Sequence, residues 1–575
     1  MNELHISESN GKVALLDKIT FFILFFVSIL VPVFFLPVSF ISNQFGTSLL
    51  FGFGVIIASL VYITRILISG YINVENSNKN LWGLFFIVPI IYLLAGIANG
   101  FSRMSFFGYT FDISTVGFIL LAFIYLYLVS VLFNHKNKIF YAFLGFGLSF
   151  VIVSLFLFLR MIFGVDLFSF GIFPNLTSTV LGSWNNLGTF FAISTIVSMM
   201  SLEMLRSSKL VKVIMTIGFV ISLFFLSLVN FGTIWLSVGF VSLVFLVYNF
   251  FNHNSDSSFV KKIAVYPLIT LVISLVFVIW GANLGSFISN TFNILNVDVR
   301  PSLSVTLDIA NNTILNRPVF GSGPNTFTTQ WLSYRPIDVI STIYWNADFN
   351  YGIGLLPTFA VTTGLAGIIS WIIFFAFYLK FGIKSLFAKF EDFVLKFLVV
   401  TSFFVSFYLW IMSFFYIPSG PIFVLTLFFT GLFFASLYVS GNLSFDKKVF
   451  INNPKTGFVS SLSLVSIFVI VLFIGYGLFK NSNSLWYFQQ ANYAVNTEGD
   501  LEKAEVNIVN AIEQVSYDVY FRALSEIQSI KLRSIISQTG ENVTQEELSS
   551  QIEGVLPDLI SSALSARNSD RKSVV

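Results

Sequence analysis

The segment from residue 18 to residue 40, KITFFILFFVSILVPVFFLPVSF, contains one charged side chain, that of Lys18. About 20 predominantly apolar residues are enough to cross the hydrocarbon core of a bilayer as an α-helix. Only helices and closed barrels satisfy their backbone hydrogen bonds in that core, so the segment predicts a membrane-spanning helix. It is too long for a cleaved leader and lacks a small-residue cleavage site, which favours an uncleaved signal anchor.

Similar apolar runs recur along the chain. Of its 575 residues, 56% are hydrophobic and only 10% are charged, whereas about a quarter of the residues in a soluble domain carry charge. The runs predict an all-α polytopic membrane protein with about 13 transmembrane helices. The spans after the first are 47–70, 80–100, 115–133, 139–163, 188–205, 210–230, 232–251, 259–281, 353–379, 393–416, 418–440 and 456–480.

The distribution of lysine indicates the side of each predicted connection. Lysine and arginine accumulate in the cytoplasmic loops of membrane proteins. Every second connection contains lysine and the intervening ones contain none, so the N-terminus is expected in the cytoplasm and the C-terminal tail outside. The lysines are Lys12, Lys18, Lys79, Lys136, Lys138, Lys209, Lys212, Lys261, Lys262, Lys380, Lys384, Lys389, Lys396, Lys447, Lys448 and Lys455.

A long loop interrupts the predicted membrane domain of residues 1–480. It covers residues 282–352, outside the cytoplasm between the ninth and tenth spans, and loops of this length are usually functional or disordered. Its aromatic and apolar residues argue against disorder. Four apolar residues at helical spacing predict an amphipathic helix on the membrane face, which ends at Asn316 because Pro318 biases the preceding residue away from helical geometry. They are Leu303, Leu307, Ala310 and Ile314.

Residues 481–575 are predicted to form an extracytoplasmic helical tail. The spacing of residues 499–504, Ile508 and Ala511 reproduces the small-residue pattern of a tetratricopeptide helix pair. Weaker helical patterns cover 519–537 and 545–565. The tail is therefore expected to be a short helical-repeat domain or, alternatively, a generic helical hairpin, and to recruit an acceptor or a protein partner.

The absence of some reactive side chains restricts the chemistry. The chain has no cysteine, which excludes disulfides, thiolate metal sites and cysteine nucleophiles. Its three histidines, His5, His135 and His253, all fall on the predicted cytoplasmic side. We expect no metal and no other cofactor. A formal net charge of +3 leaves no basic footprint for nucleic acid.

Four arginines are candidates for binding an anionic substrate outside the cytoplasm. The guanidinium group holds phosphate oxygens in a planar, bidentate geometry, so a phosphorylated substrate is the expected ligand. Arg160, at the end of the fifth span, is interpreted either as a ligand contact or as the partner of Asp166 in a structural ion pair. The candidates are Arg160, Arg300, Arg317 and Arg335.

Small, polar and aromatic residues surround these arginines. Asp348 is a candidate general base and Asn350 accompanies it just before the tenth span. Asn185 and Asn186 open the sixth span, where they are expected to cap the helix. A glycine-rich turn and a tryptophan are interpreted as shaping the loop. They are Gly321, Gly323, Pro324, Asn325 and Trp345.

Taken as a set, these motifs resemble the O-antigen ligase and polymerase-like family, over roughly residues 140–440. The family pattern has an arginine before a loop helix, then a proline and a glycine-x-glycine turn, and then a catalytic loop that enters a span with glycine-leucine-x-glycine. Matching residues here are Arg300, Leu307, Pro318, Phe320, Gly321, Gly323, Phe327, Thr363, Gly364, Leu365 and Gly367, together with the stretches 182–186 and 230–235.

The resemblance implies a polyprenol-dependent membrane glycosyltransferase of the bacterial cytoplasmic (inner) membrane. Such an enzyme moves a glycan from undecaprenyl diphosphate to a glycan, lipid or protein acceptor outside that membrane, in cell-envelope polysaccharide biosynthesis. The resemblance implies that Arg300 is the loop arginine that holds the diphosphate, with Arg160 as a second contact, and that no metal is needed.

The chain departs from the family in its catalytic loop. Family members commonly carry a histidine there, whereas residues 345–351 contain Asp348 and Asn350 and no histidine. Either Asp348 replaces the histidine, or the acceptor chemistry differs, or the chain is a divergent member. Two other functions remain open: a flippase or transporter of lipid-linked sugars, and a non-catalytic membrane scaffold that presents the tail.

Overall fold

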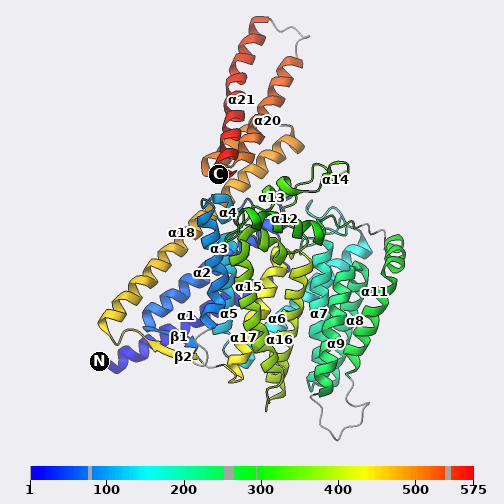
Figure 1. Cartoon of the computed structure of the whole chain (residues 1–575), viewed down its shortest axis with the longest axis vertical. Helices are drawn as coiled ribbons and strands as arrows, with labels where there is room; N and C mark the ends of the chain where they lie inside the picture. Colours follow the sequence, from blue (N-terminus) through cyan, green and yellow to red (C-terminus); the bar gives the residue numbers. More distant parts are fainter. Residues whose placement is uncertain are drawn as a thin grey trace.

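The protein is an assembly of long helices with a helical tail projecting from one end (Figure 1). A computed structural model describes residues 2–75, 81–251, 264–292, 294, 296–342, 344–443, 445–537 and 545–574. Lys79, Lys261, Lys262 and His253, which contributed to the predicted topology, lie outside the described residues.

Eleven of the described helices are long and apolar enough to cross a membrane, which confirms the all-α polytopic class. They are α1 (Asn2–Leu30), α2 (Asn43–Ser69), α6 (Lys136–Phe163), α7 (Trp184–Met204), α8 (Lys209–Val229), α9 (Gly232–Phe251), α11 (Val265–Phe292), α15 (Leu355–Leu386), α16 (Phe393–Phe415), α17 (Gly420–Val439) and α18 (Pro454–Tyr493). Two shorter apolar helices, α3 (Leu81–Ala98) and α5 (Val116–Leu132), occupy the other two predicted spans. The count of about 13 crossings stays a prediction.

The first and ninth predicted spans have different limits in the structure. The first ends at Leu30, not at residue 40, because Pro32 has no N–H to continue the helix and its ring would clash with the preceding turn. The ninth runs on to Phe292, so residues 282–292, assigned to the loop by the sequence, belong to α11.

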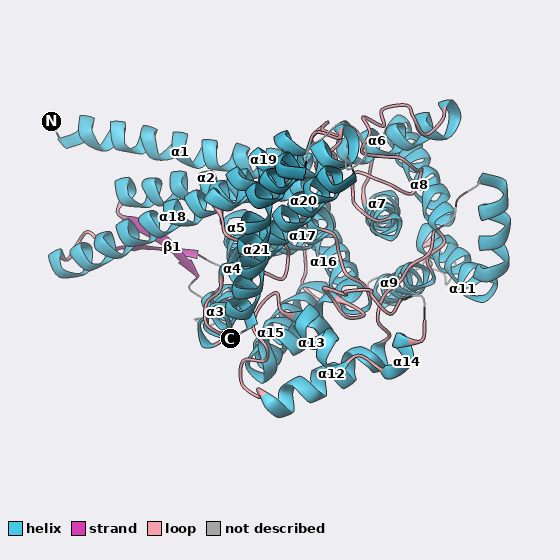
Figure 2. Ribbon diagram, turned by 90° about the horizontal axis from the view of Figure 1, so that it is seen from above, coloured by secondary structure: helices cyan, strands magenta, loops and turns pink. Residues whose placement is uncertain are grey.

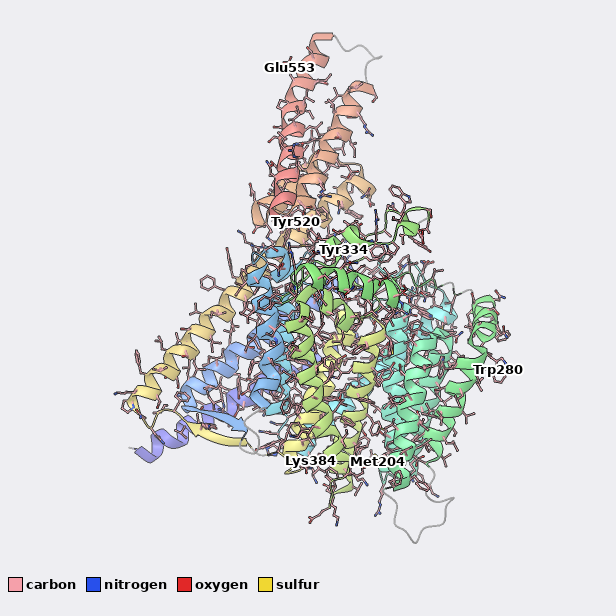
Figure 3. The ribbon with its side chains drawn as sticks, viewed as in Figure 1. Met204, Trp280, Tyr334, Lys384, Tyr520 and Glu553 are labelled. Atoms are coloured by element: carbon pink, nitrogen blue, oxygen red, sulfur yellow. The ribbon has the colours of Figure 1, made fainter. Side chains whose placement is uncertain are left out.

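The connections rich in lysine lie at one end of the helix layer. Met204 and Lys384 are at this end, whereas Tyr334 and Tyr520 are at the other (Figure 3). Strands β1 (Tyr71–Glu75) and β2 (Phe445–Val449) pair antiparallel, on the lysine side (Figure 1). We call the opposite end, which carries the loop helices and the tail, the tail side. Which side faces the cytoplasm stays a prediction.

Helix burial divides the membrane layer into a centre and a periphery. Helix α17 buries almost its whole length, including Phe423, Phe428 and Phe433, and packs against α5 and α16. In the apolar part of α18, by contrast, only three positions spaced by seven residues are buried, Leu464, Val471 and Leu478. This period of two turns gives one narrow seam, so α18 is a peripheral helix with most of its apolar surface exposed.

Short helices cover the tail side. They are α4 (Arg103–Phe107), α12 (Leu303–Asn316), α13 (Phe327–Tyr334) and α14 (Ile337–Ile340). Figure 2, which looks down on this side, shows α12 and α13 beside the end of α15. The predicted end of the loop helix at Asn316 is confirmed. Of the four apolar residues at helical spacing, Leu303 and Leu307 are exposed and Ala310 is buried, together with Thr306 and Ile309.

The tail grows directly out of the last membrane helix. Helix α18 continues through residue 481, where the sequence places the domain boundary, and is followed by η1 (Ala494–Glu498), α19 (Leu501–Gln514), α20 (Asp518–Ser537) and α21 (Gln545–Val574). Gly499 ends the turn with a φ of 71°, and Asp500 caps α19. The small residues singled out in the sequence, Ala504, Ile508 and Ala511, are buried against the end of α18. Whether this pair is a repeat unit or a generic hairpin stays open.

Candidate functional site

A polar cavity of about 820 Å³ opens among the connections on the tail side. The α1–α2 connection, the segment before α5, the α6–α7 connection and the segment after α16 form its walls. Amide and hydroxyl groups dominate its polar lining, with one carboxylate. The polar side chains are those of Ser39, Ser42, Asn43, Gln44, Ser48, Thr110, Asp112, Ser178, Thr179, Ser183, Asn186, Asn350, Tyr351, Tyr416 and Ser419.

An apolar groove of about 620 Å³ lies between α1 and α2, next to this cavity along the chain. Phe34, Leu36 and Leu49 line the groove, and residues 39–44 between them line the cavity. Phe22 and Phe26 of the groove are 42% and 54% exposed, so it opens sideways into the region that a bilayer would occupy. Successive stretches of the α1–α2 connection thus line a lipid-facing groove and a polar cavity.

Asp112 supplies the carboxylate of the cavity and was not among the sequence candidates for catalysis. Burial raises the pKa of the Asp112 carboxyl, while a hydrogen bond of 2.5 Å from the Thr110 hydroxyl to its Oδ1 opposes that rise. Asp112 stands between Phe111 and Ile113, both buried. An acidic residue between two buried apolar residues was the available signal, and a single sequence does not distinguish it from an ordinary connection.

Asn325 ties the long loop to the cavity wall. It adopts a φ of 60° at the end of the glycine-rich turn, as predicted for a residue that shapes the loop. Its Oδ1 accepts a 2.7 Å hydrogen bond from the Ser114 hydroxyl, and its Nδ2 donates to the Met104 carbonyl at 3.2 Å. Tyr351, whose hydroxyl lies 3.4 Å from that of Ser114, extends the same cluster into the cavity.

The two glycine motifs of the family resemblance contact each other. Gly364 interrupts α15 with a φ of 61°, and the freed backbone groups pair with the turn at residues 318–323. Leu365 N–H donates to the Pro318 carbonyl at 3.0 Å, and Gly323 N–H donates to the Thr362 carbonyl at 2.9 Å. A Cβ atom on Gly321 would lie 2.4 Å from the Val361 carbonyl oxygen, so only glycine fits this approach.

Asn185 and Asn186 do not cap α7, contrary to the prediction. Ser183 is the cap, because its hydroxyl accepts the N–H of Asn186 at 3.2 Å. The Asn186 side chain reaches across the cavity wall and accepts the N–H of Ser419 at 3.0 Å. Asn185 is buried and faces a neighbouring cavity of about 280 Å³, where Asn296 contacts its Oδ1 at 3.4 Å.

Arg300 lies between the two cavities. Its Nε forms a 3.0 Å ion pair with Asp298, and its Nη1 donates to the carbonyls of Ile353 and Phe415 at 3.2 Å and 2.5 Å. The guanidinium carbon is 5.0 Å from the ring centre of Tyr416, which lines the larger cavity. Arg300 is therefore fixed on the far side of an aromatic wall of the site, with its positive charge close to the cavity.

Arg160 has a structural role in this fold. Its guanidinium is 1% exposed and donates to four backbone carbonyls within 3.2 Å. These carbonyls belong to Val165, Phe173, Asn175 and Ser178 in the α6–α7 connection. The predicted ion pair with Asp166 is wrong, because backbone oxygens take its place. The guanidinium holds the connection in shape, including Phe173 and Ser178 of the cavity lining, and Arg160 itself is not among the lining residues.

The remaining candidates lie on the surface of the long loop. Arg317 donates to Asn99 Oδ1 at 3.0 Å, and Arg335 donates to the carbonyl of Trp345 at 2.7 Å. Asp348 is exposed and is not among the residues that line the cavity. Asn350 does line it, and its Oδ1 accepts from the Thr328 hydroxyl at 2.7 Å.

The long loop therefore contributes Asn350 and Tyr351 to the cavity, while its arginines stay at the rim or outside. His135 directly precedes α6 and is not among the residues that line the cavity. The side chain of His5 is outside the described residues, as is the whole of His253.

Neither protein-family models nor curated proteins gave a match to this chain. The resemblance to the O-antigen ligase family therefore rests on the sequence motifs quoted above. The contact between its two glycine motifs gives those residues a shared structural role, which is a statement about the fold and not about activity.

Proposed function

We propose that this protein is a membrane glycosyltransferase that moves a glycan from undecaprenyl diphosphate to an acceptor at the tail side. One observation carries the proposal: successive stretches of one connection line a cavity with amide and hydroxyl groups and an apolar groove that opens toward lipid. Amide and hydroxyl groups suit the hydroxyls of a sugar, and the groove suits an isoprenoid chain. A lipid-linked glycan combines both chemistries in one molecule.

In this proposal Asp112 is the general base. The acceptor hydroxyl attacks the anomeric carbon and transfers its proton to the Asp112 carboxylate. The new bond joins the acceptor oxygen to that carbon, while the bond from the carbon to the diphosphate oxygen breaks. The diphosphate leaves with the bonding electron pair. A carboxylate whose pKa is raised by burial is a stronger base than an exposed one, which suits this role.

Arg300 supplies positive charge near the departing diphosphate. Its ion pair and backbone hydrogen bonds fix the guanidinium before substrate arrives, so little reorganisation is needed as negative charge develops. Arg160 is not assigned to diphosphate binding, because its guanidinium donates its hydrogen bonds to backbone carbonyls of the protein. Asn186 and Asn350 are assigned to binding sugar hydroxyls.

The interrupted helix α15 is the feature that would favour a flippase. Discontinuous helices in transporters expose backbone groups to a substrate near the bilayer midplane. In α15, however, the groups freed at Gly364 pair with the turn at residues 318–323, and the break is nine residues from the start of the helix. The break thus serves the fold of the loop, and we retain the transferase as the proposal.

The test is donor turnover by the purified protein in detergent. The donor is an undecaprenyl-diphosphate-linked glycan, and the readout is release of undecaprenyl diphosphate in the presence of EDTA. Asp112→Asn should lower turnover by at least about a hundredfold, since general-base contributions are typically of that size or more. Arg300→Gln should also lower it. Asp308→Asn, which neutralises an exposed carboxylate of the loop helix, is the matched control.

Three outcomes would contradict the proposal, either in its choice of base or as a whole. Loss of turnover in Asp348→Asn but not in Asp112→Asn would move the base to the exposed loop carboxylate. Donor translocation in proteoliposomes without turnover would establish the flippase. If the protein neither binds the donor nor turns it over, the non-catalytic scaffold would be the remaining function.

A further inference from the structure

A second groove, of about 370 Å³, lies between the α3–α4 segment and the peripheral helix α18. Three phenylalanines form one side, Phe101, Phe106 and Phe107. Three apolar residues of α18 form the other side, Ile470, Phe473 and Ile474. No residue of this groove lines the polar cavity or the groove between α1 and α2.

This groove opens to the side of the helix layer. Phe473 is 71% exposed, Ile470 is 55% exposed and Phe101 is 48% exposed. All three lie near the tail-side end of the predicted spans 80–100 and 456–480. In a bilayer, the apolar part of the groove would therefore be next to lipid chains and its upper end next to the headgroups.

The upper end of the groove contains Arg103. Its guanidinium carbon is 5.6 Å from the ring centre of Phe107. Its Nε and Nη2 are buried, and among the described residues neither has a hydrogen-bond partner. No described carboxylate forms an ion pair with Arg103.

A guanidinium with two buried, unpartnered nitrogens is costly. Desolvating a charge is unfavourable by several kcal/mol unless an opposite charge or hydrogen bonds compensate, and charged side chains at the membrane edge are usually paired. The other buried arginine of the tail side, Arg160, is fully compensated by carbonyls. Arg103 has less compensation: its guanidinium interacts with the Tyr517 hydroxyl, and two of its nitrogens still lack a described partner, so a further ligand is expected to be an anion that approaches from the groove.

We propose that the Arg103 groove binds one anionic phospholipid. The phosphate pairs with the positive charge of Arg103, which lines the groove, and an acyl chain lies along Phe106, Ile470 and Phe473. The apolar walls select a lipid over a soluble phosphate. The lack of shared residues with the polar cavity separates this ligand from the lipid-linked donor, so the inference does not depend on the proposed function.

The bound lipid would also touch the anchor of the tail. The Tyr517 hydroxyl lies 2.9 Å from the Gly108 carbonyl oxygen and 2.6 Å from Asn481 Oδ1, and the positive charge of Arg103 opposes the rise in the Tyr517 pKa that burial causes. Phosphate at Arg103 would thus sit beside the contact between the tail and residues 103–109.

The test uses the full chain in nanodiscs of phosphatidylcholine with or without phosphatidylglycerol. Native mass spectrometry after mild extraction counts the retained phosphatidylglycerol, and thermal unfolding measures its stabilising effect. Arg103→Gln should retain this lipid about tenfold less, the size expected for losing charge-assisted hydrogen bonds. Arg335→Gln, which removes one charge from the same side but outside the groove, should retain it like wild type.

Stability without anionic lipid separates this role from a structural one. In phosphatidylcholine alone, Arg103→Gln should unfold at the same temperature as wild type or higher, because an uncompensated charge has been removed. A variant that fills the groove, Ile474→Trp, should also lose the lipid while keeping Arg103. Equal retention in Arg103→Gln and wild type would overturn the proposal. Destabilisation of Arg103→Gln in phosphatidylcholine would do so too, as would retention of undecaprenyl phosphate in preference to phosphatidylglycerol.

Discussion

The segments around Arg160 and Arg103 differ in how they provide hydrogen-bond acceptors for a guanidinium group. Each brings a guanidinium under the tail side of the helix layer. At Arg160 the protein supplies the acceptors, through four carbonyls of the α6–α7 connection. At Arg103 two buried nitrogens remain without a described partner. The comparison shows that an arginine on the tail side indicates a ligand only after its internal acceptors have been counted.

The largest expected effect is at Arg160, where the α6–α7 connection supplies the hydrogen-bond acceptors. Arg160→Ala leaves four buried carbonyl oxygens without their donor and should reduce the free energy of unfolding by about 3 kcal/mol or more. Thermal unfolding of the detergent-solubilised protein measures it. Arg160→Lys keeps the charge but has fewer donors, so its stability should lie between those of the wild type and Arg160→Ala. Wild-type stability in Arg160→Ala would break the comparison, since the connection would then not depend on these hydrogen bonds.

The next effect tests another closed contact, between the turn at Gly321 and the break in α15. Gly321→Ala should cost about 2 kcal/mol or more, because it adds a Cβ 2.4 Å from the Val361 oxygen to the penalty for a left-handed backbone. The matched control is Gly100→Ala. Its φ is also positive, 88°, but no atom lies within 4 Å of the new Cβ, so it should cost about 1 kcal/mol. Equal losses in both variants would attribute the whole effect to backbone strain.

The next effect concerns Asp112, whose carboxylate is kept for a substrate in the proposed function. Its substitution should therefore affect stability differently from that of Arg160. Burial raises the pKa of Asp112 in the folded protein, so the folded state holds this proton more tightly than the unfolded state does. The wild type should therefore lose stability as pH rises from the unfolded value, about 3.9, through the raised folded value. Asp112→Asn should lack this loss and equal or exceed wild-type stability at neutral pH. Thermal unfolding as a function of pH checks this, and a less stable Asn variant at neutral pH would place Asp112 with the closed contacts.

The smallest effect is expected at Arg335, which donates to a single carbonyl near the surface. Arg335→Ala should change the free energy of unfolding by no more than about 0.5 kcal/mol. The same substitution at Arg160 removes the same chemical group, so the ratio of the two effects measures what burial and the number of acceptors contribute. A loss at Arg335 as large as at Arg160 would remove the distinction.

Much of the fold could be predicted from the sequence because membrane helices are local features. Long apolar runs identify α2, α16 and α17 to within a few residues, and Pro318 marks the end of α12. The full set of buried residues on α12 could not be predicted. Its buried Thr306 accepts the N–H of Ile353 from a distant segment, and such a contact outweighs the hydrophobic pattern.

The site was predicted less well because it is assembled from several connections. Asn186, Asn350 and Arg300 do gather around the cavity, as their polar character near the predicted span ends suggested. The carbonyl partners of Arg160 and the place of Asp112 depend on backbone contacts that no side-chain pattern reports. The two glycine motifs were recognised separately along the chain, and their mutual contact is a tertiary feature.

Because α18 is one continuous helix, the tail is joined rigidly to the last membrane helix. A helix of 40 residues is about 60 Å long, and here one rod runs from the lysine side into the tail. The rod is fixed near its upper third, where Asn481 donates to the carbonyls of Gly108 and Tyr109 at 3.2 Å. Gly108 and Tyr109 lie a few residues before Asp112, so a partner that tilts the tail applies its torque close to the cavity wall.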